Sequence, residues 1–187
     1  MAKVTTSSPG ALFPTPVVLV TTVDDNGRAN IITLAWVGIV CSNPLMISAA
    51  IRPNRHSHGL LKTTPELVVN VPTRDLVAKT DYCGCVSGRT TDKFAATGFT
   101  ALSSQQIKPP MIQECPINLE CRVVKTLSLG SHDVFISEVV LIHVDEELLN
   151  DKGKADFTRT APFSYIGMDY WALTDKIGHY GFTKGVL

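Results

Sequence analysis

Residues 16–34 read PVVLVTTVDDNGRANIITL and contain two apolar, β-branched runs separated by a turn signal. The first run, residues 16–23, ends at Asp24-Asp25-Asn26-Gly27, where such residue types tolerate the left-handed backbone of a tight turn. The second run, residues 29–34, predicts the return strand. The segment therefore predicts a β-hairpin and favours a fold made mainly of antiparallel strands.

Further strands are predicted at residues 45–51, 67–71, 117–124 and 132–144. In residues 117–124 apolar and polar side chains alternate, which is the period of a strand with two different faces. Short helices are predicted at residues 57–61, 74–79 and 92–96, the last with Thr90 or Thr91 as its N-cap. Six or so strands with short helices between them predict a mainly β fold, a closed antiparallel barrel, with an open sandwich as the alternative.

The composition limits what this barrel can do. The chain has 187 residues with 17 basic and 17 acidic side chains, so its formal net charge is zero. The length predicts a single domain, residues 1–187, and the neutral balance argues against nucleic acid as a partner. The longest apolar run, residues 31–41, is shorter than the roughly 20 residues that cross a membrane. Charged residues are 18% of the chain, against about 25% on average, which hints at a surface covered by a second copy.

The cysteines and histidines give no metal or disulfide signature. Five cysteines, an odd number, do not form a disulfide framework, so we expect reduced thiols in a cytoplasmic protein. Cys83-Gly84-Cys85 lacks the two-residue spacing of zinc and thioredoxin-like sites. We therefore expect ordinary thiols there and no bound metal, and His56 with His58 is too small a set to change that expectation.

One segment before a predicted helix concentrates groups that bind an anion. Arg52 and Arg55 supply positive charge, while Asn54 and Ser57 supply neutral hydrogen-bond donors. A helix that follows directly would add free N–H groups, and a phosphate monoester suits such a set. A solvated turn with a helix cap is the simpler interpretation of this segment taken alone.

A second segment, residues 87–94, has the same character. A glycine turn, hydroxyl side chains and Lys93 stand at the start of another predicted helix, and Lys93 could add a point charge to the same phosphate. A capped helix with an exposed charged face is the alternative. The pattern does not show whether the two segments meet in space.

Residues 30–36 run out of the second strand and could seat a flat heterocycle. Trp36 would supply an apolar wall, Ala35 a close approach, and Asn30 and Thr33 polar contacts. Composition alone favours Trp36 as a core residue. His132, which follows the Gly130-Ser131 turn, either faces solvent or points at a ligand, and Tyr165 raises the same choice between packing and stacking.

In chain order, the segments PTPVVLVTT, DDNG, NIITLAW, IRPNRHS, SGRTTDKF and GSHDVFISEVV resemble the flavin reductase-like proteins of the FMN-binding split-barrel fold, above all flavoredoxin and its relatives. The resemblance covers roughly residues 12–170. It implies a six-stranded Greek-key barrel, a homodimer, and one non-covalent FMN per subunit near the dimer interface.

The resemblance also implies roles for individual residues. His132 matches the histidine beside the flavin and is the expected catalytic residue, and Ser57 matches the hydroxyl that binds the FMN phosphate. Ser137 stands where relatives often have glycine. The full set of implied FMN-binding residues is Asn30, Thr33, Leu34, Ala35, Trp36, Arg52, Asn54, Arg55, Ser57, Lys93, His132 and Tyr165.

Three functions are compatible with the sequence. The first is an FMN-binding redox protein of the flavoredoxin type, reduced by a partner protein. The second is an NAD(P)H-dependent flavin or ferric reductase that uses FMN as cofactor or substrate, and the third is a barrel without flavin that serves as an interaction domain. No triad or carboxylate pair is present in the sequence, which agrees with chemistry supplied by a cofactor.

Overall fold

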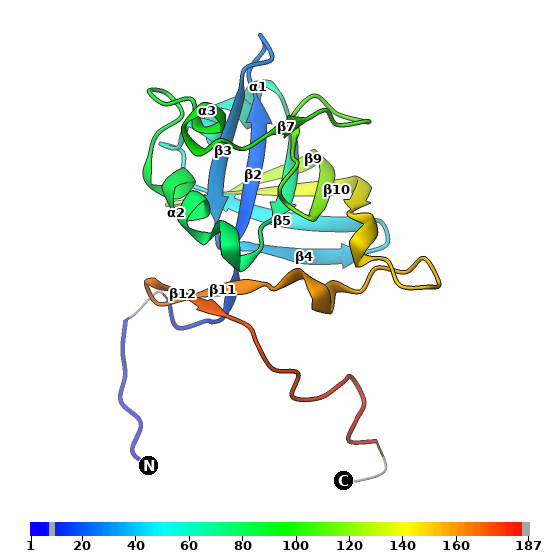
Figure 1. Cartoon of the computed structure of the whole chain (residues 1–187). Coiled ribbons are helices and arrows are strands. Elements are labelled where there is room, and N and C mark those ends of the chain that lie inside the picture. The colour runs from blue at the N-terminus through cyan, green and yellow to red at the C-terminus, as the bar shows by residue number, and fades with distance from the viewer. Residues whose placement is uncertain (8–9, 185–187) are drawn as a thin grey trace.

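A computed structural model describes residues 1–7 and 10–184 of the chain, and its centre is a seven-stranded antiparallel sheet (Figure 1). The strands lie in the order β3-β2-β6-β9-β10-β5-β4. Their bounds are β2 Val18–Val23, β3 Ala29–Leu34, β4 Val37–Ser42, β5 Leu45–Ile51, β6 Glu66–Val71, β9 Ile117–Ser128 and β10 Asp133–Val144.

The connection between β3 and β4 closes this sheet into a barrel. The two strands stand at opposite ends of the strand order, yet only Ala35 and Trp36 separate them in the chain. An extended chain advances at most about 3.6 Å per residue, so Leu34 and Val37 lie within about 11 Å of each other. Ala50 of β5 also donates its N–H to the Trp36 carbonyl at 3.0 Å. The mainly β antiparallel barrel that the sequence predicts is confirmed.

The strand count differs from the predicted six because residues 37–42 form β4, where the pattern predicts no strand. Residues 31–41 are one apolar run broken only by Thr33 and Gly38. Nothing in its periodicity marks the point at Ala35 where the chain passes from one edge of the sheet to the other. The run therefore supplies two strands instead of one strand and a loop.

The predicted hairpin is confirmed, because β2 and β3 pair antiparallel from Val18–Leu34 to Val23–Ala29. Gly27 takes a φ of +80° in the connecting turn, and its N–H donates to the Asp24 carbonyl at 3.0 Å. A positive φ is readily adopted only by glycine, so the turn depends on this residue.

The helices are short and lie in the connections. They are α1 His56–Thr63, α2 Val77–Cys85 and α3 Lys93–Thr97, with 3₁₀ turns at Arg74–Leu76, Glu146–Leu148 and Phe157–Thr160. The N-cap of α3 is Asp92, whose carboxylate accepts the Ala95 N–H at 3.1 Å, so the prediction of Thr90 or Thr91 is wrong. A carboxylate at this position gains from the helix dipole as well as from the hydrogen bond. No helix in the described residues is long and apolar enough to span a membrane.

Two small sheets complete the fold. One joins β1 Thr15–Pro16, β11 Phe163–Ile166 and β12 Asp169–Ala172, and the other pairs β7 Ala101–Leu102 with β8 Met111–Ile112. The first sheet lies below the barrel in Figure 1, next to β4, and places Tyr165 near the point where β3 ends.

Strand β2 is buried on both faces, which explains why its apolar residues do not alternate with exposed polar ones. Val18 and Val20 belong to the cluster inside the barrel, whereas Leu19 packs outside against Ile31, Cys83 and other residues. Helices α2 and α3 cover this outer face (Figure 1). Helices α2 and α3 also place residues, among them Gly84 and Lys93, in the wall of a cleft beside β3 that is described below.

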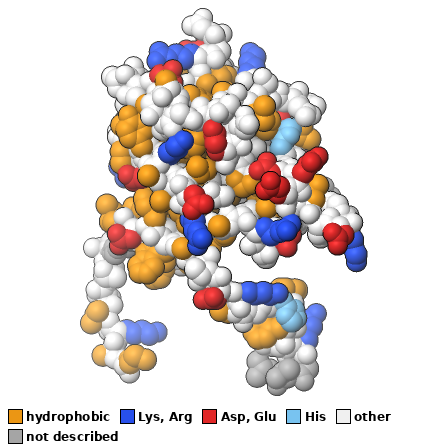
Figure 2. Space-filling model, in the orientation of Figure 1, with side chains coloured by type: hydrophobic (Ala, Val, Ile, Leu, Met, Phe, Trp, Pro, Cys, Tyr) orange, Lys and Arg blue, Asp and Glu red, His pale blue; other side chains and the backbone are white. Residues whose placement is uncertain are grey.

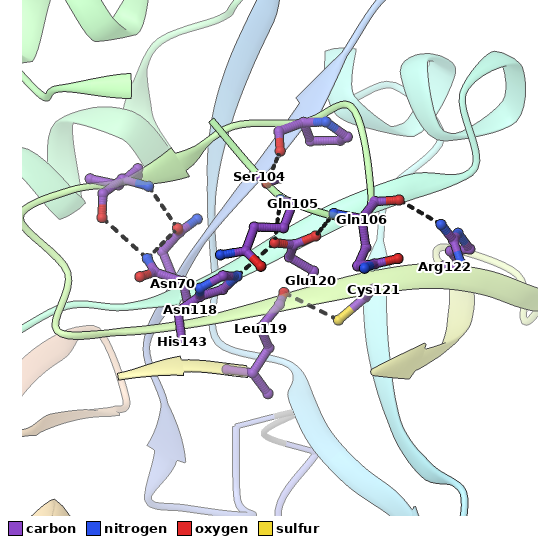
Figure 3. Close-up of polar contacts among 12 residues, drawn as sticks. Asn70, Ser104, Gln105, Gln106, Asn118, Leu119, Glu120, Cys121, Arg122 and His143 are labelled. Carbon is purple, nitrogen blue, oxygen red and sulfur yellow. Dashed lines mark hydrogen bonds and ion pairs between the residues drawn. The ribbon is translucent and has the colours of Figure 1, made fainter. Parts of the chain in front are cut away.

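On the polar face of β9, Asn118 and Glu120 are buried, whereas Arg122 is exposed (Figure 3). The Glu120 side chain is 0% exposed, and its carboxylate accepts the N–H groups of Gln105 and Gln106 at 2.8 and 2.7 Å. His143 of β10 contacts the same carboxylate at 2.6 Å. The predicted alternation is confirmed, but the polar side of β9 faces a covering loop. The Glu120 carboxylate can be buried there because each of its oxygens has a hydrogen-bond donor.

Candidate functional site

A cleft runs along β3 and consists of two adjoining hollows. The first, called here the polar hollow, is lined by Asn30, Asn54, Arg55, Ser57 and Lys93 together with residues 83, 84 and 86–88. The second, the apolar hollow, is lined by Thr33, Leu34, Ala35, Trp36, Arg52, Arg55, His132 and Tyr165. Ile32, Arg55 and Gly84 line both hollows. The structure thus brings every predicted site residue to one cleft.

Ser57 and Asn30 form a buried hydrogen-bonded pair in the polar hollow. The Asn30 Nδ2 donates to the Ser57 Oγ at 2.7 Å, and the Thr22 hydroxyl approaches the same oxygen at 3.4 Å. The Oδ1 of Asn30 is buried and has no hydrogen-bond partner within the described residues. A buried acceptor without a donor is costly, so this atom suits a ligand that brings a hydroxyl or N–H group.

Gly88 is a site residue that the sequence analysis assigned only to a turn. A Cβ at this position would lie 1.8 Å from the Asn30 Oδ1 and 2.6 Å from the Asn30 Cγ. Only glycine therefore allows residues 86–89 to close over Asn30. Its neighbour Arg89, also absent from the prediction, donates to the Asn54 carbonyl at 2.9 Å and ties the two anion-binding segments together. The sequence signal was a glycine between two polar residues, which by itself indicates only a turn.

Lys93 is buried at the bottom of the polar hollow. Its Nζ donates to the carbonyls of Ile31 and Cys83, both at 2.6 Å, and so joins α3 to β3 and α2. An ammonium group has three donors, which leaves one for a ligand. Burial lowers the pKa of Lys93, and the charge of Arg55 lowers it further. A dianion beside it would relieve that cost.

Positive charge gathers at this end of the cleft. Burial and then the charges of Arg89, Arg28 and Lys93 lower the pKa of His56, which lines the polar hollow. Arg55, at the N-cap of α1, makes no ion pair within the described part of the chain. The helix therefore begins at the hollow, and its positive end adds to the field. The polar hollow is suited to a phosphate.

Trp36 and His132 face each other in the apolar hollow. Their ring centroids are 4.7 Å apart with an interplanar angle of 42°. Trp36 is 50% exposed, so the interpretation of Trp36 as a core residue is wrong. Trp36 points outward because it lies in the two-residue connection, here called the seam, where the chain passes from β3 at one sheet edge to β4 at the other. His132 is half-buried, and burial followed by the charge of Arg52 lowers its pKa.

Two of the predicted site residues, Thr33 and Tyr165, already use their hydroxyl groups for contacts within the protein. The Thr33 hydroxyl donates to the Thr80 carbonyl of α2 at 2.5 Å, so only its oxygen and its backbone remain for a ligand. The Tyr165 hydroxyl lies 3.6 Å from the Met168 sulfur. Gly84 of α2 packs closely against Thr33, because a Cβ at Gly84 would lie 3.2 Å from the Thr33 Cβ.

The cysteines near the cleft are free thiols of different character. Cys83 is buried, and desolvation raises the pKa of its thiol to about 11, whereas Cys85 is exposed. A thiol with a raised pKa is a poor nucleophile, so the structure supports an ordinary thiol at Cys83. Within residues 1–7 and 10–184, no three His, Cys, Asp or Glu side chains gather as metal ligands would.

Together, the closed barrel and its two-part cleft define a split-barrel protein with one end fitted to a phosphate and the other to a flat ring. A family model described as flavin reductase like domain matches residues 10–167. The chain therefore belongs to the flavin reductase-like family, and its function is flavin-related redox chemistry with a flavin as cofactor.

Individual relatives agree with this assignment. The chain is 31% identical to flavoredoxin from Methanosarcina acetivorans, with all of both chains covered and a TM-score of 0.90. It is 28% identical to flavoredoxin of Desulfovibrio vulgaris (Miyazaki F), with 96% of this chain and 98% of the other covered and a TM-score of 0.89. An uncharacterized protein of Archaeoglobus fulgidus is 36% identical over 129 residues, which are 69% of this chain and 72% of that protein.

Proposed function

We propose that this protein binds FMN non-covalently in the cleft and carries electrons to or from a partner protein, as a redox protein of the flavoredoxin type. The observation that carries the proposal is the buried, unpartnered Oδ1 of Asn30, which lines the polar hollow beside Ile32, a residue shared by both hollows. A ribityl hydroxyl between phosphate and ring is a donor suited to this atom. Bound FMN supplies redox chemistry that no side chain of the chain provides.

The polar hollow would hold the phosphate. The Ser57 Oγ accepts from Asn30 and keeps its own proton for a phosphate oxygen. Arg55 and the third donor of Lys93 supply charge, and charge-assisted hydrogen bonds are the stronger kind. Gly88 leaves room for this arrangement and Arg89 holds the two segments in place.

His132 is the proposed catalytic residue. Its lowered pKa makes the imidazole neutral near pH 7, with one N–H to donate. The Ser131 Oγ lies 2.9 Å from the His132 Nδ1, and a serine hydroxyl that donates there would leave the proton of His132 on Nε2. A donor at the edge of the apolar hollow stabilises negative charge that develops on a reduced ring.

The family match favours a second candidate function, an NAD(P)H-dependent reductase that uses FMN as cofactor or substrate. Trp36 is half-exposed at the mouth of the apolar hollow, so a second flat ring has an open route to the first. Both functions use the same FMN site and differ in the electron donor.

The visible spectrum of the purified protein, followed by NADH and NADPH additions without oxygen, tests both candidates. Oxidised-flavin bands that survive both additions and bleach with dithionite are the expected result. Prompt bleaching by either nucleotide would make the protein a reductase. A colourless protein to which added FMN does not bind would overturn both candidates and leave an interaction domain.

A homodimer is also part of the proposal. The support is the low share of charged residues and the exposed apolar side chains of β4, which follows Trp36 directly. An interface at β4 would lie beside the apolar hollow.

A further inference from the structure

A buried histidine–aspartate pair lies beneath the cleft and belongs to neither hollow. The His58 Nε2 is 2.7 Å from the Asp133 Oδ2, and both side chains are buried. Phe135 packs edge-on against the His58 ring at a centroid distance of 5.4 Å. A buried carboxylate this close to an imidazole is held in one geometry, because leaving either group unpaired is costly.

The two partners each adjoin a residue of the cleft. His58 follows Ser57 in α1, and Asp133 follows His132 at the start of β10. Neighbouring side chains on a helix are about 100° apart, so fixing His58 fixes the direction of Ser57. In extended backbone, neighbouring side chains point to opposite sides, so an inward Asp133 directs His132 outward, where it meets Trp36.

Asp133 also connects the pair to the rest of the cleft wall. It pairs with Ile51, the residue before Arg52, at the end of β5, and with Ser128 at the end of β9. Hydrogen bonds from His58 and then from the Ser128 side chain hold the pKa of Asp133 below its usual range. The carboxylate is therefore ionised near neutral pH and ties α1 and the end of β9 to the start of β10.

We propose that His58 and Asp133 are positioning residues that hold Ser57, at the phosphate end of the cleft, and His132, at the ring end, in a fixed relation to each other; this rests on the proposed binding of FMN. Neither residue lines the cleft. Their effect is transmitted through Ser57 and His132.

The chain offers a matched control in the His143–Glu120 pair. It has the same chemistry, with the His143 Nε2 2.6 Å from a buried carboxylate on the same barrel, but neither residue lines the cleft (Figure 3). If the His58 substitution only destabilises the barrel, the His143 substitution should weaken FMN binding to the same extent. If it releases Ser57 and His132, only the His58 substitution should weaken FMN binding.

The test compares His58→Leu and His58→Gln with His143→Leu, measuring FMN affinity, midpoint potential and the NMR signals of His132. We expect His58→Leu to weaken FMN binding about tenfold, comparable with the loss of an outer hydrogen bond to a ligating side chain, and to shift the potential. In the FMN-free protein, the His132 proton signals should lose the ring-current shift caused by Trp36. His58→Gln keeps a donor toward Asp133 and should restore most of the affinity.

His143→Leu should lower the melting temperature and leave FMN affinity, potential and His132 signals unchanged. If His58→Leu does not fold, Asp133→Asn replaces it in the same measurements. Wild-type values in the His58 or Asp133 variant, or equal losses in the His143 variant, would overturn the proposal. The FMN-free NMR measurement decides the positioning role by itself, so a wild-type protein that binds no FMN would reject only the proposed function.

Discussion

Single residues decide how closely the walls of the cleft approach each other. Gly88 and Asn30 are the clearest case, because their contact leaves no space for one extra carbon. The same contact leaves the Asn30 Oδ1 buried and without a hydrogen-bond partner within the described residues. Close packing and ligand binding therefore depend on the same pair of residues.

We expect Gly88→Ala to weaken FMN binding at least about tenfold, because the new methyl group must displace the amide of Asn30 from Ser57. Titration of the FMN-free protein by flavin fluorescence measures this. Gly59→Ala is the control, since a Cβ there meets nothing within 4 Å and α1 should gain about 0.5–1 kcal/mol of stability. Equal FMN affinity in the two variants would count against the assigned role of Gly88.

At the same scale, we expect His132→Ala to weaken FMN binding or lower the midpoint potential, because a hydrogen-bond donor at the ring edge is lost. Spectroelectrochemical titration measures the potential. His179→Ala, in the terminal arm outside the cleft, is the control and should behave as wild type. Unchanged affinity together with an unchanged potential in His132→Ala would remove His132 from the mechanism.

At the scale of elements, one loop is attached to the barrel in part through a single buried carboxylate. Residues 104–110 cover the polar face of β9, and Glu120 accepts two N–H groups from this loop (Figure 3). Burial by itself raises the pKa of Glu120, but the hydrogen bonds from Gln105, His143 and Gln106 outweigh it and hold the pKa below its usual value. The loop's attachment is therefore sensitive to acid.

The sign of that sensitivity follows from linkage. A carboxyl with a lowered folded-state pKa contributes stability above its unfolded pKa, about 4.3, and loses it as the pH falls through the folded value. We expect the free energy of unfolding, from urea titrations between pH 7 and 3, to fall in acid more steeply for wild type than for Glu120→Gln. Parallel curves for the two proteins would contradict this role of Glu120.

At the scale of the whole molecule, apolar surface is concentrated at one end. Ile39 and Val40 of β4 are 74% and 53% exposed, and both terminal arms carry exposed apolar side chains, among them Leu12, Phe13, Ile177 and Tyr180. Figure 2 shows hydrophobic side chains along both arms below the barrel. Contiguous exposed apolar surface marks an interaction site more often than a free surface does.

We expect sedimentation analysis to show a mass about twice 20.3 kDa for wild type, and Ile39→Lys to shift the protein towards the monomer, because a charge would be buried in the interface. Leu102→Lys is the control: Leu102 is also exposed, but β7 lies at the opposite end of the barrel (Figure 1). A wild-type monomer, or a dimer untouched by Ile39→Lys, would contradict an interface at β4.

Much of this architecture was predictable because its signals are local. The hairpin at residues 16–34 depends on β-branched runs and Gly27, and β9 on an alternation within one strand. The site residues were found through a resemblance in the order of short motifs, and the structure then placed them along one cleft. Strand β4, Gly88 and the burial of Glu120 were missed, because each depends on which distant segment packs against it.

Sequence alone specifies the antiparallel strands, the neutral charge balance and the two cation-bearing segments, because propensity, turn geometry and charge act between residues close in the chain. Tertiary structure alone decided that those segments meet, that Trp36 faces outward at the seam, and that His58 reaches Asp133 across 75 residues. The physical reason is barrel closure: Ala35 and Trp36 bring two sheet edges together, and the cleft exists only where those edges meet.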